Sequence, residues 1–332
     1  MLRPGPLNLI TDVPGLTVGQ AVDERVGSGV TTLLFDGFWP TGVDVRGGGP
    51  GLRETETLSP ENFVGKAHAI TLAGGSVFGL AAADGVVIAL SQQGIGLRLK
   101  PQSSAIPIVP GAVLHDLDGD GDEDWGTEPP YRRLGQESVL AAGRSFELGS
   151  VGAGRGAKAG TLKGGLGSAS LDLGEGIMVG ALVAANPMGS VFMPDGRTYW
   201  AWPFEIGEEF GGVRPAPDSA PAIDPVPDFT RLNSLGRTQI GANTTLAIVA
   251  ASVDLTTAEC KRLAMMAQDG LARAIRPVHT PFDGDTVFAA AKGVALATTA
   301  SDRAAQISRI GSAAADCLAR AIARAVYHAR AR

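Results

Sequence analysis

The sequence predicts a single layered α/β domain that spans residues 1–332. Two observations lead to this prediction. Short apolar, β-branched segments that are typical of buried strands alternate with glycine-rich turns in the first half of the chain. Helical segments with apolar residues on one face only fill the last third, and such a helix must bury that face against another layer. No internal repeat is evident.

The elements expected in the first half follow one another closely. Residues 30–35 are apolar and β-branched, and the glycine-rich segment 42–55 follows them. Residues 68–72 form the next strand-like segment. Residues 77–92 are rich in Ala, Val and Leu and have the length of a helix. Ser76 is a suitable N-cap for this helix, because its hydroxyl can accept a free N–H group of the first turn.

The middle of the chain predicts two loops and one buried strand. Residues 115–128 form an acidic loop punctuated by glycine. Residues 177–185 have the pattern of a buried strand, which ends at Asn186. Five prolines lie between positions 215 and 227, within the segment 214–228. Proline opposes both helix and ladder, so this segment is expected to be a long surface loop.

The last third contains the clearest signals. Residues 245–252 form an apolar strand, and the capping box Thr256-x-x-Glu259 opens an amphipathic helix. Strands are expected at 286–290 and 293–299. A long helix with one apolar face then begins near Asp302.

Composition and charge exclude several classes of protein. Lys and Arg number 28 and Asp and Glu 34, so the net charge is −6 and no basic surface for nucleic acid is expected. No segment approaches the ~20 apolar residues of a membrane span, and the N-terminus lacks the pattern of a secretory signal. Cys260 and Cys317 are too few for a disulfide framework or a zinc cluster. We therefore expect a cytoplasmic protein that binds neither nucleic acid nor a membrane.

Two segments imitate ligand-binding loops without completing them. The run Asp116-x-Asp118-x-Asp120-Gly121 begins like an EF-hand calcium loop, but its twelfth position is Thr127, which has no carboxylate. A solvated acidic loop is expected at 116–128, with a weak structural calcium site as the alternative. The run 152–160 lacks the spacing and the following helix of a dinucleotide fingerprint. Neither an organic cofactor nor a catalytic metal is expected.

The candidate nucleophile is Thr244, at the start of the strand 245–252. The four histidines are scattered without a ligand spacing or an obvious partner, and no GxSxG motif is present. Threonine is a weak nucleophile unless a base lies beside it, and an N-terminal threonine carries that base as its own α-amine. In an intact chain this nitrogen is an amide, so the chemistry requires cleavage between Asn243 and Thr244. From the residues alone, an ordinary buried strand remains the alternative.

A series of motifs in one order resembles the self-processing aminopeptidases. This family includes D-aminopeptidases, L-aminopeptidase-D-esterases, β-peptidyl aminopeptidases and nylon-oligomer hydrolases. The resemblance covers nearly the whole chain, and a threonine nucleophile is similar to the nylon-oligomer branch. The motifs are DVPGLTVG (12–19), RGGGPG (46–51), RET (53–55), LAGGSVFGL (72–80), IPIVP (106–110), KGG (163–165), IGANTTLAIVAA (240–251) and PFDGDTVFA (281–289).

The resemblance implies a fold, a processing event and a set of site residues. The fold is a single-domain α-β-β-α sandwich that cuts itself into two associated chains, 1–243 and 244–332. Thr244 attacks amides, and Asn186 donates to the oxyanion. Lys163, or its rival Lys158, lies near the nucleophile. Asp283 and Asp285 orient the Thr244 amine.

The activity that follows is hydrolysis of amide bonds in small peptides or ω-amino-acid oligomers through an acyl-Thr244 intermediate. One alternative is an acyltransferase of the ornithine-acetyltransferase type, which passes the acyl group to an amine instead of water. The other is a scaffold that binds a ligand and stays uncut. The family also suggests a homo-oligomer, namely a tetramer.

Overall fold

One long strand, β2 (Ser28–Val45), joins the two halves of the structure. The computed structural model describes residues 3–119, 121–217, 224–234 and 243–330. The first part of β2 pairs with two antiparallel neighbours, β1 (Leu16–Asp23) and β4 (Lys66–Ala73). Its last residues pair with β11 (Thr286–Val294). The register shifts between Leu34 and Trp39, so β2 passes from one group of strands to the other.

The strands form two groups, one on each side of β2. Hydrogen bonds connect them in the order β3-β5-β4-β2-β11-β10-β9-β8, with β1 also on β2. β10 runs parallel to β11 and antiparallel to β9. The remaining strands are β3 (Gly51–Arg53), β5 (Gly111–Val113), β8 (Gly165–Asp172), β9 (Met178–Asn186), β10 (Thr244–Val253) and the hairpin of β6 (Lys158–Ala159) and β7 (Leu162–Lys163).

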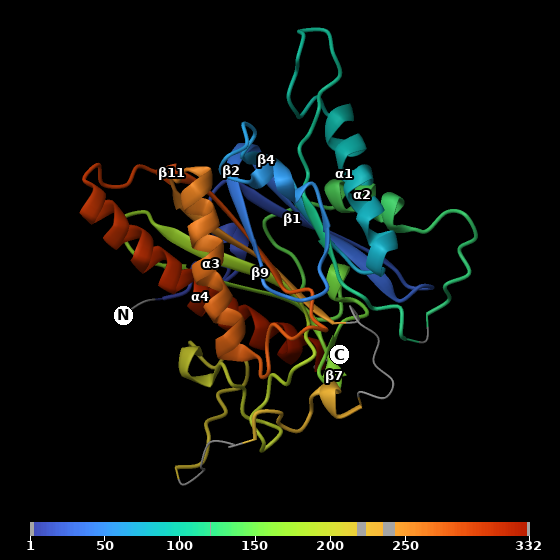
Figure 1. Ribbon diagram of the computed structural model, residues 1–332, viewed down its shortest axis with the longest axis vertical. Helices are drawn as coiled ribbons and strands as arrows, with labels where there is room; N and C mark the ends of the chain where they lie inside the picture. The colour runs from blue at the N-terminus through green and yellow to red at the C-terminus, as the bar shows by residue number, and fades with distance from the viewer. Residues whose placement is uncertain (1–2, 120, 218–223, 235–242, 331–332) are drawn as a thin grey trace.

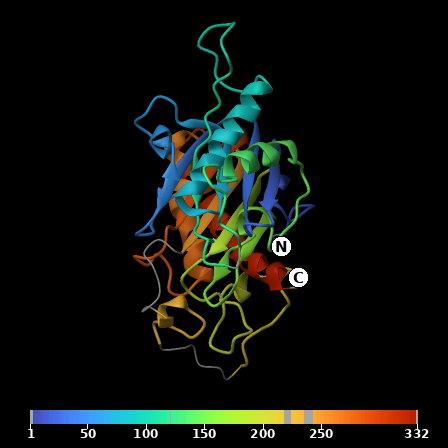
Figure 2. The ribbon, with the colours of Figure 1, turned by 90° about the vertical axis from the view of Figure 1, so that its right-hand side faces the viewer.

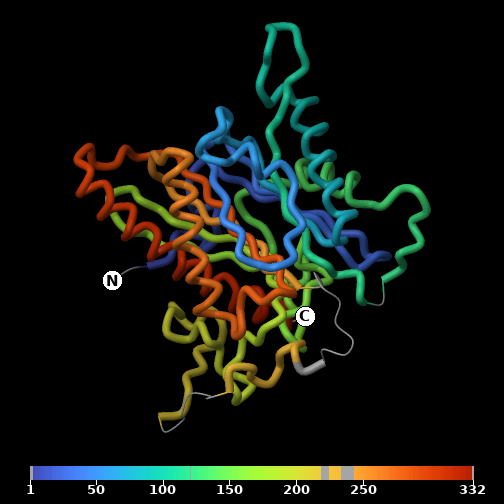
Figure 3. The backbone as a smooth tube through the Cα atoms, viewed as in Figure 1, coloured from blue at the N-terminus to red at the C-terminus, as the bar shows by residue number. Residues whose placement is uncertain are grey.

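Two pairs of helices cover the outer faces of the strands (Figure 1). α1 (Ala81–Gln92) and α2 (Tyr131–Leu140) pack on the β4 side, and α3 (Thr257–Ala274) and α4 (Ala300–Arg330) pack on the β9–β10 side. Figure 2 shows the same layers from the side, and Figure 3 shows the path of the backbone through them. Short 3-10 helices occur at Ile10–Asp12, Thr55–Leu58, Ser76–Leu80, Gly152–Gly154, Trp202–Phe204 and Arg231–Ser234.

The alternation along β10 shows how the layers are held together. Leu246, Ile248 and Ala250 pack into a core shared with Leu33 and Ile70 of the other strand group. The alternate residues of β10 face the second core, which is formed with α3 and α4. A strand that is buried on both faces has an almost continuous apolar sequence, and β10 has such a sequence. The expected α/β single domain with an α-β-β-α arrangement is confirmed.

Most expected elements are found, with two corrections. The capping box of α3 is formed, since Thr256 Oγ1 accepts from Glu259 N at 3.2 Å and Glu259 Oε2 accepts from Thr256 N at 2.8 Å. The strand expected at 293–299 is wrong, because β11 continues to Val294 and ends there. Ser76 does not cap α1. It lies in a 3-10 helix with a positive φ of 52°, and α1 begins only at Ala81.

Part of the proline-rich segment 214–228 lies outside the described residues, namely 218–223. Over the described part of the chain, the search for a helix both long and apolar enough to cross a membrane finds none.

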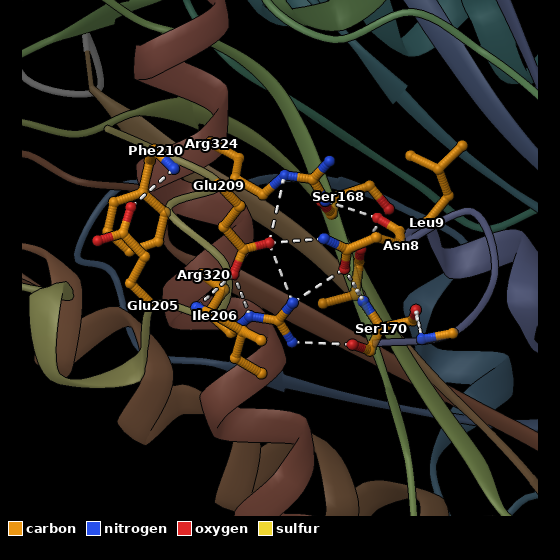
Figure 4. A network of polar contacts seen from close by, with 12 residues as sticks. Asn8, Leu9, Ser168, Ser170, Glu205, Ile206, Glu209, Phe210, Arg320 and Arg324 are labelled. Carbon is orange, nitrogen blue, oxygen red and sulfur yellow. Dashed lines mark hydrogen bonds and ion pairs between the residues drawn. The ribbon is translucent and has the colours of Figure 1, made fainter. Parts of the chain in front are cut away.

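A buried ion network joins α4 to the rest of the domain (Figure 4). Arg320 is fully buried, and its Nε contacts Glu209 Oε1 at 2.5 Å while its Nη1 donates to Ser170 O at 2.8 Å. Arg324 Nη1 donates to Asn8 O at 2.6 Å and to Ser168 O. Although burial opposes ionisation, the hydrogen bond and charge of Arg320 hold the pKa of the Glu209 carboxyl below its usual value.

We predict that Arg320→Ala lowers the free energy of unfolding by about 3–5 kcal/mol, because it leaves the Glu209 carboxylate buried with a weaker partner. The matched control is Arg3→Ala, which removes an exposed pair with Asp172 and is expected to change it by at most ~1 kcal/mol. Urea unfolding followed by circular dichroism measures both. Equal effects of the two substitutions contradict the prediction.

Candidate active site

Thr244 lies where the ends of three central strands meet. It is the first residue of β10 and pairs in register with Asn186, the last residue of β9. Asn243 forms a parallel bridge with Asp283, which comes shortly before β11. Asn243 is fully buried and Thr244 is 2% exposed. The topology therefore brings residues that are far apart in the sequence to one buried point.

Two groups converge on the carbonyl oxygen of Asn243. The backbone N–H of Gly284 donates to it at 2.9 Å, and the Thr244 hydroxyl also contacts it. A fixed N–H donor polarises a carbonyl and stabilises the negative charge that develops there when a nucleophile attacks. The peptide bond between Asn243 and Thr244 therefore has a hydroxyl group and a backbone N–H donor beside it.

Asp283 is 1% exposed and is fixed by three hydrogen bonds. Its Oδ1 accepts from Met188 N at 3.0 Å, and its Oδ2 accepts from Thr280 N at 3.1 Å and from Thr280 Oγ1 at 2.5 Å. Burial and the nearby charge of Asp285 raise the pKa of Asp283 to about 6, in spite of these donors. The side chain thus changes charge near neutral pH, as a general base or acid must.

Asp285 connects the strand of Thr244 to a histidine. Its Oδ1 accepts from Thr245 N at 2.8 Å. Its Oδ2 accepts from His279 N at 3.1 Å and lies 2.8 Å from His279 Nδ1. The expectation that no histidine has a partner is therefore wrong for His279. This contact arises from a loop that folds back on itself, which the spacing of the four histidines does not reveal.

Glycine permits the close packing around the two aspartates. A Cβ on Gly284 would lie 2.7 Å from Thr244 Oγ1. A Cβ on Gly47 would lie 2.3 Å from both Asp283 O and Asp285 N, and one on Gly48 would lie 2.7 Å from Pro281. Real Cβ atoms do not approach so closely, so the RGGGPG segment serves to pack against the aspartate loop.

Both the oxygen and the nitrogen of the Asn186 side-chain amide form hydrogen bonds. Its Oδ1 accepts from Lys158 N at 2.9 Å and from Arg231 Nη2 at 3.3 Å. Its Nδ2 donates to His115 O at 3.0 Å. The structure thus places Asn186 beside Thr244, as expected. The donor that reaches the Asn243 carbonyl oxygen is Gly284 N, which the sequence did not suggest.

The two candidate lysines face each other in the β6–β7 hairpin. Lys158 Nζ contacts Asp118 Oδ2 at 2.9 Å, and Lys163 is exposed. Within the described parts of the chain, neither ammonium group makes an ion pair or hydrogen bond with Thr244 or the two aspartates. Both lysines line a cavity of about 400 Å³ together with Asp116 and Arg155. The prediction that Lys163 is the site lysine stays a prediction.

The aspartates of the acidic loop bind separate partners. Asp116 is buried and accepts from Gly75 N at 2.7 Å, Asp118 pairs with Lys158, and Asp122 pairs with Arg25 at 3.0 Å. Asp120 lies outside the described residues. Among the other residues of this loop, which the structure describes, no three carboxylates lie close enough together to hold a metal ion.

Thr244, Asn186, Asp283 and Asp285 are therefore brought together, and Lys163 lies at the neighbouring cavity. His279, Thr280 and Gly284 were missed. A signal for them existed in the sequence, since all three lie within the run from His279 to Asp285. Gly284 contributes a backbone group, and residue types alone say little about backbone groups.

Comparisons with known proteins show which proteins the chain is similar to. The model of peptidase family S58 matches residues 8–332. An uncharacterised aminopeptidase of Mycobacterium tuberculosis is 42% identical over 98% of this chain and 95% of its own length. A 6-aminohexanoate-oligomer endohydrolase of Agromyces sp. is 30% identical over 84% of this chain and 73% of its own length.

The chain is also similar in fold to proteins of known structure. A beta-aminopeptidase of Burkholderia sp. has a TM-score of 0.69 and 25% identity, covering 98% of this chain and 88% of its own. The L-aminopeptidase D-Ala-esterase/amidase of Ochrobactrum anthropi, described as a variant of the Ntn hydrolase fold, has a TM-score of 0.67 and 20% identity, covering 97% and 86%. From the family match over residues 8–332 and these relatives, we conclude that the chain belongs to peptidase family S58.

Proposed function

We propose that this protein is an amide hydrolase that first cuts its own chain between Asn243 and Thr244 and then uses the new N-terminal Thr244 as its nucleophile. The observation that carries the proposal is the convergence of the Thr244 hydroxyl and the Gly284 N–H on the Asn243 carbonyl oxygen. Membership in peptidase family S58 supports amide bonds as the target.

The self-cleavage proceeds in two steps. The Thr244 hydroxyl oxygen attacks the Asn243 carbonyl carbon, the Gly284 N–H stabilises the oxyanion, and the hydroxyl proton passes to a base. The C–N bond then breaks, the Thr244 nitrogen takes a proton, and an ester joins Asn243 to the Thr244 oxygen. Water hydrolyses this ester and releases a carboxylate at Asn243 and the hydroxyl of Thr244, whose amine was freed when the C–N bond broke.

The contacts of the intact chain suit this reaction. Asp283, bridged to Asn243 and with its pKa raised by burial, is the proposed base. Asp285 binds Thr245 N and so fixes the strand that carries the nucleophile. The Asn243 side-chain amide is buried and has no hydrogen-bond partner among the described residues. An unsatisfied buried amide costs free energy, and cleavage allows this residue to leave.

In the cut protein the Thr244 α-amine takes the proton of its own hydroxyl, and the hydroxyl attacks a substrate amide. Asn186 and Gly284 N are the proposed oxyanion donors, and Lys163 is proposed to keep the nearby amine neutral through its charge. An acyl-Thr244 ester forms and water resolves it. These steps use side chains and backbone groups of the chain for every proton and charge.

The alternative of acyl transfer differs only in the final acceptor. The relatives named as aminopeptidases or oligomer hydrolases favour water over an acceptor amine. Product analysis with and without an acceptor amine, such as ornithine, distinguishes the two reactions. We propose small peptides and ω-amino-acid oligomers as substrates, in keeping with the same relatives. A cytoplasmic location and a homotetramer remain predictions, and light scattering of the purified protein tests the latter.

We predict that Thr244→Ala gives one uncut and inactive chain, because it lacks the attacking oxygen. Thr244→Ser keeps a hydroxyl at the same position and should still cut, giving fragments 1–243 and 244–332 that stay associated. A denaturing gel and intact mass report cleavage, and gel filtration reports association. Cleavage of Thr244→Ala at the same bond would show that another group performs the reaction.

Gly284→Ala is expected to slow self-cleavage by about 100-fold, because its Cβ would displace the Thr244 hydroxyl, and a shift of ~1 Å at a reacting atom has that effect. Gly143→Ala is the matched control, since its Cβ meets its nearest neighbour at an ordinary 3.7 Å. The fraction of cut chain over time measures both variants. Equal rates of self-cleavage for Gly284→Ala and the wild type would contradict the proposed role of Gly284 at the cleavage site.

The raised pKa of Asp283 predicts opposite pH trends for self-cleavage and stability. The rate of self-cleavage should rise as the pH increases through about 6, where Asp283, the proposed base, loses its proton. Stability should fall between about pH 4 and 6, that is, between the ordinary pKa and the raised one. The folded-state pKa exceeds the ordinary value of 3.8, so folding binds a proton that is released as pH rises.

Asp283→Asn should slow self-cleavage by at least ~100-fold and flatten the stability change between about pH 4 and 6. Burial also raises the pKa of Asp116 to about 6, so the difference between wild type and Asp283→Asn isolates the contribution of Asp283. Urea unfolding at several pH values and a pH–rate profile provide the measurements. An unchanged rate of self-cleavage in Asp283→Asn, or an unchanged dependence of that rate on pH, contradicts this assignment.

A further inference from the structure

Arg231 binds three consecutive backbone carbonyl groups at the point where β9 ends. It is the first residue of the short helix Arg231–Ser234, which lies ahead of the proposed cleavage site in the chain. Its Nη2 donates to Asn186 O at 3.0 Å and to Pro187 O at 3.1 Å. Its backbone N–H donates to Met188 O at 3.0 Å. We call these three residues the β9 end segment, and a single arginine binds all of them.

The β9 end segment also contacts the groups that are proposed to carry out self-cleavage. Asn186 is the register partner of Thr244, and Met188 N donates to Asp283 Oδ1 at 3.0 Å. A shift of this segment would therefore move the nucleophile and the proposed base relative to each other. A misplacement of about 1 Å between reacting groups costs about 100-fold in rate. The contacts of Arg231 thus fix a segment on which the geometry of the reaction depends.

The positive charge of Arg231 also acts on Asp283. Asp285 of the same loop, whose carboxylate contacts His279 Nδ1 at 2.8 Å, has the opposite effect, because its negative charge raises the pKa of Asp283. Asp118 acts on the guanidinium from the acidic loop. A nearby cation favours the ionised carboxylate, which is the form that can accept a proton. The charge of Arg231 and its hydrogen bonds therefore favour the same reaction.

We propose that Arg231 is a positioning residue for self-cleavage, which fixes the β9 end segment against Thr244 and Asp283 and keeps a positive charge near the Asp283 carboxylate. The inference rests on the proposed function, because it assumes that the chain cuts itself at Thr244. It makes the segment ahead of the cleavage site part of the reacting structure. Self-cleavage should therefore wait until Arg231 has reached the end of β9 during folding.

The first test measures the rate of self-cleavage of freshly made chains over a range of pH. Arg231→Ala should cut about 100-fold more slowly, and the midpoint of its pH–rate profile should lie about one pH unit higher. The matched control is Arg197→Ala, which removes an exposed arginine and should behave like the wild type. An unchanged rate in Arg231→Ala, or a slower rate with an unchanged midpoint, overturns the proposal.

Two longer side chains separate the charge and hydrogen bonds of Arg231 from simple packing. Arg231→Lys keeps a positive charge and a donor group, so it should restore the wild-type midpoint and part of the rate. Arg231→Met fills much of the same space without either property, so it should behave like Arg231→Ala. Thermal unfolding shows whether each variant folds, and the comparison of Lys with Met still decides if the Ala variant does not. Equal rates and midpoints for Lys and Met overturn the proposal.

Uncut chains give a readout that does not depend on cleavage. In the Thr244→Ala background, the titration of the Asp283 carboxyl can be followed by carbon-13 NMR and assigned with Asp283→Asn. Arg231→Met should raise its midpoint, and Arg231→Lys should not. A wild-type chain that stays uncut refutes the proposed function, even if this titration behaves as expected. A wild-type chain that cuts, with equal titration midpoints for the Lys and Met variants, refutes only the role of Arg231.

Discussion

The site depends on the parallel pairing of β10 with β11, which begins at the bridge between Asn243 and Asp283. This pairing puts the backbone N–H of Gly284 on the Asn243 carbonyl oxygen and the Asp285 carboxylate on Thr245 N. Because β10 and residues 286–291 of β11 are buried, packing holds these groups in place. Reacting groups fixed in this way need little further ordering before they react.

The layers around these strands explain how the two fragments of a cut chain can stay associated. β10 has β9 on one side and β11 on the other, and β11 pairs in turn with β2. Arg320 and Arg324 of α4 bind Glu209, Asn8 and backbone oxygens of the first 243 residues. A break between Asn243 and Thr244 leaves all of these contacts in place, so the proposed second fragment stays embedded in the same cores.

The sequence predicted much of the fold and part of the site, and the difference has a physical basis. Apolar alternation and the capping box identified β10 and α3, since these signals are local. The strand expected after Lys292 failed because strand length is set by pairing, and β11 stops where its partners stop. Thr244, Asn186 and the two aspartates were named from motifs. Gly284 N, His279 and Thr280 were missed, because their contacts arise from loop paths and backbone atoms.

The central claim is that the Thr244 oxygen attacks the Asn243 carbonyl and forms an ester, and neutral hydroxylamine tests it most directly. Hydroxylamine cleaves such an ester and leaves a hydroxamate on the carbonyl side. Freshly made, uncut chain should therefore give a first fragment that ends in a hydroxamate at Asn243 and a second that begins with a free amine at Thr244, both identified by peptide mass. A carboxylate alone at Asn243, with an unchanged rate of cleavage, would contradict the account.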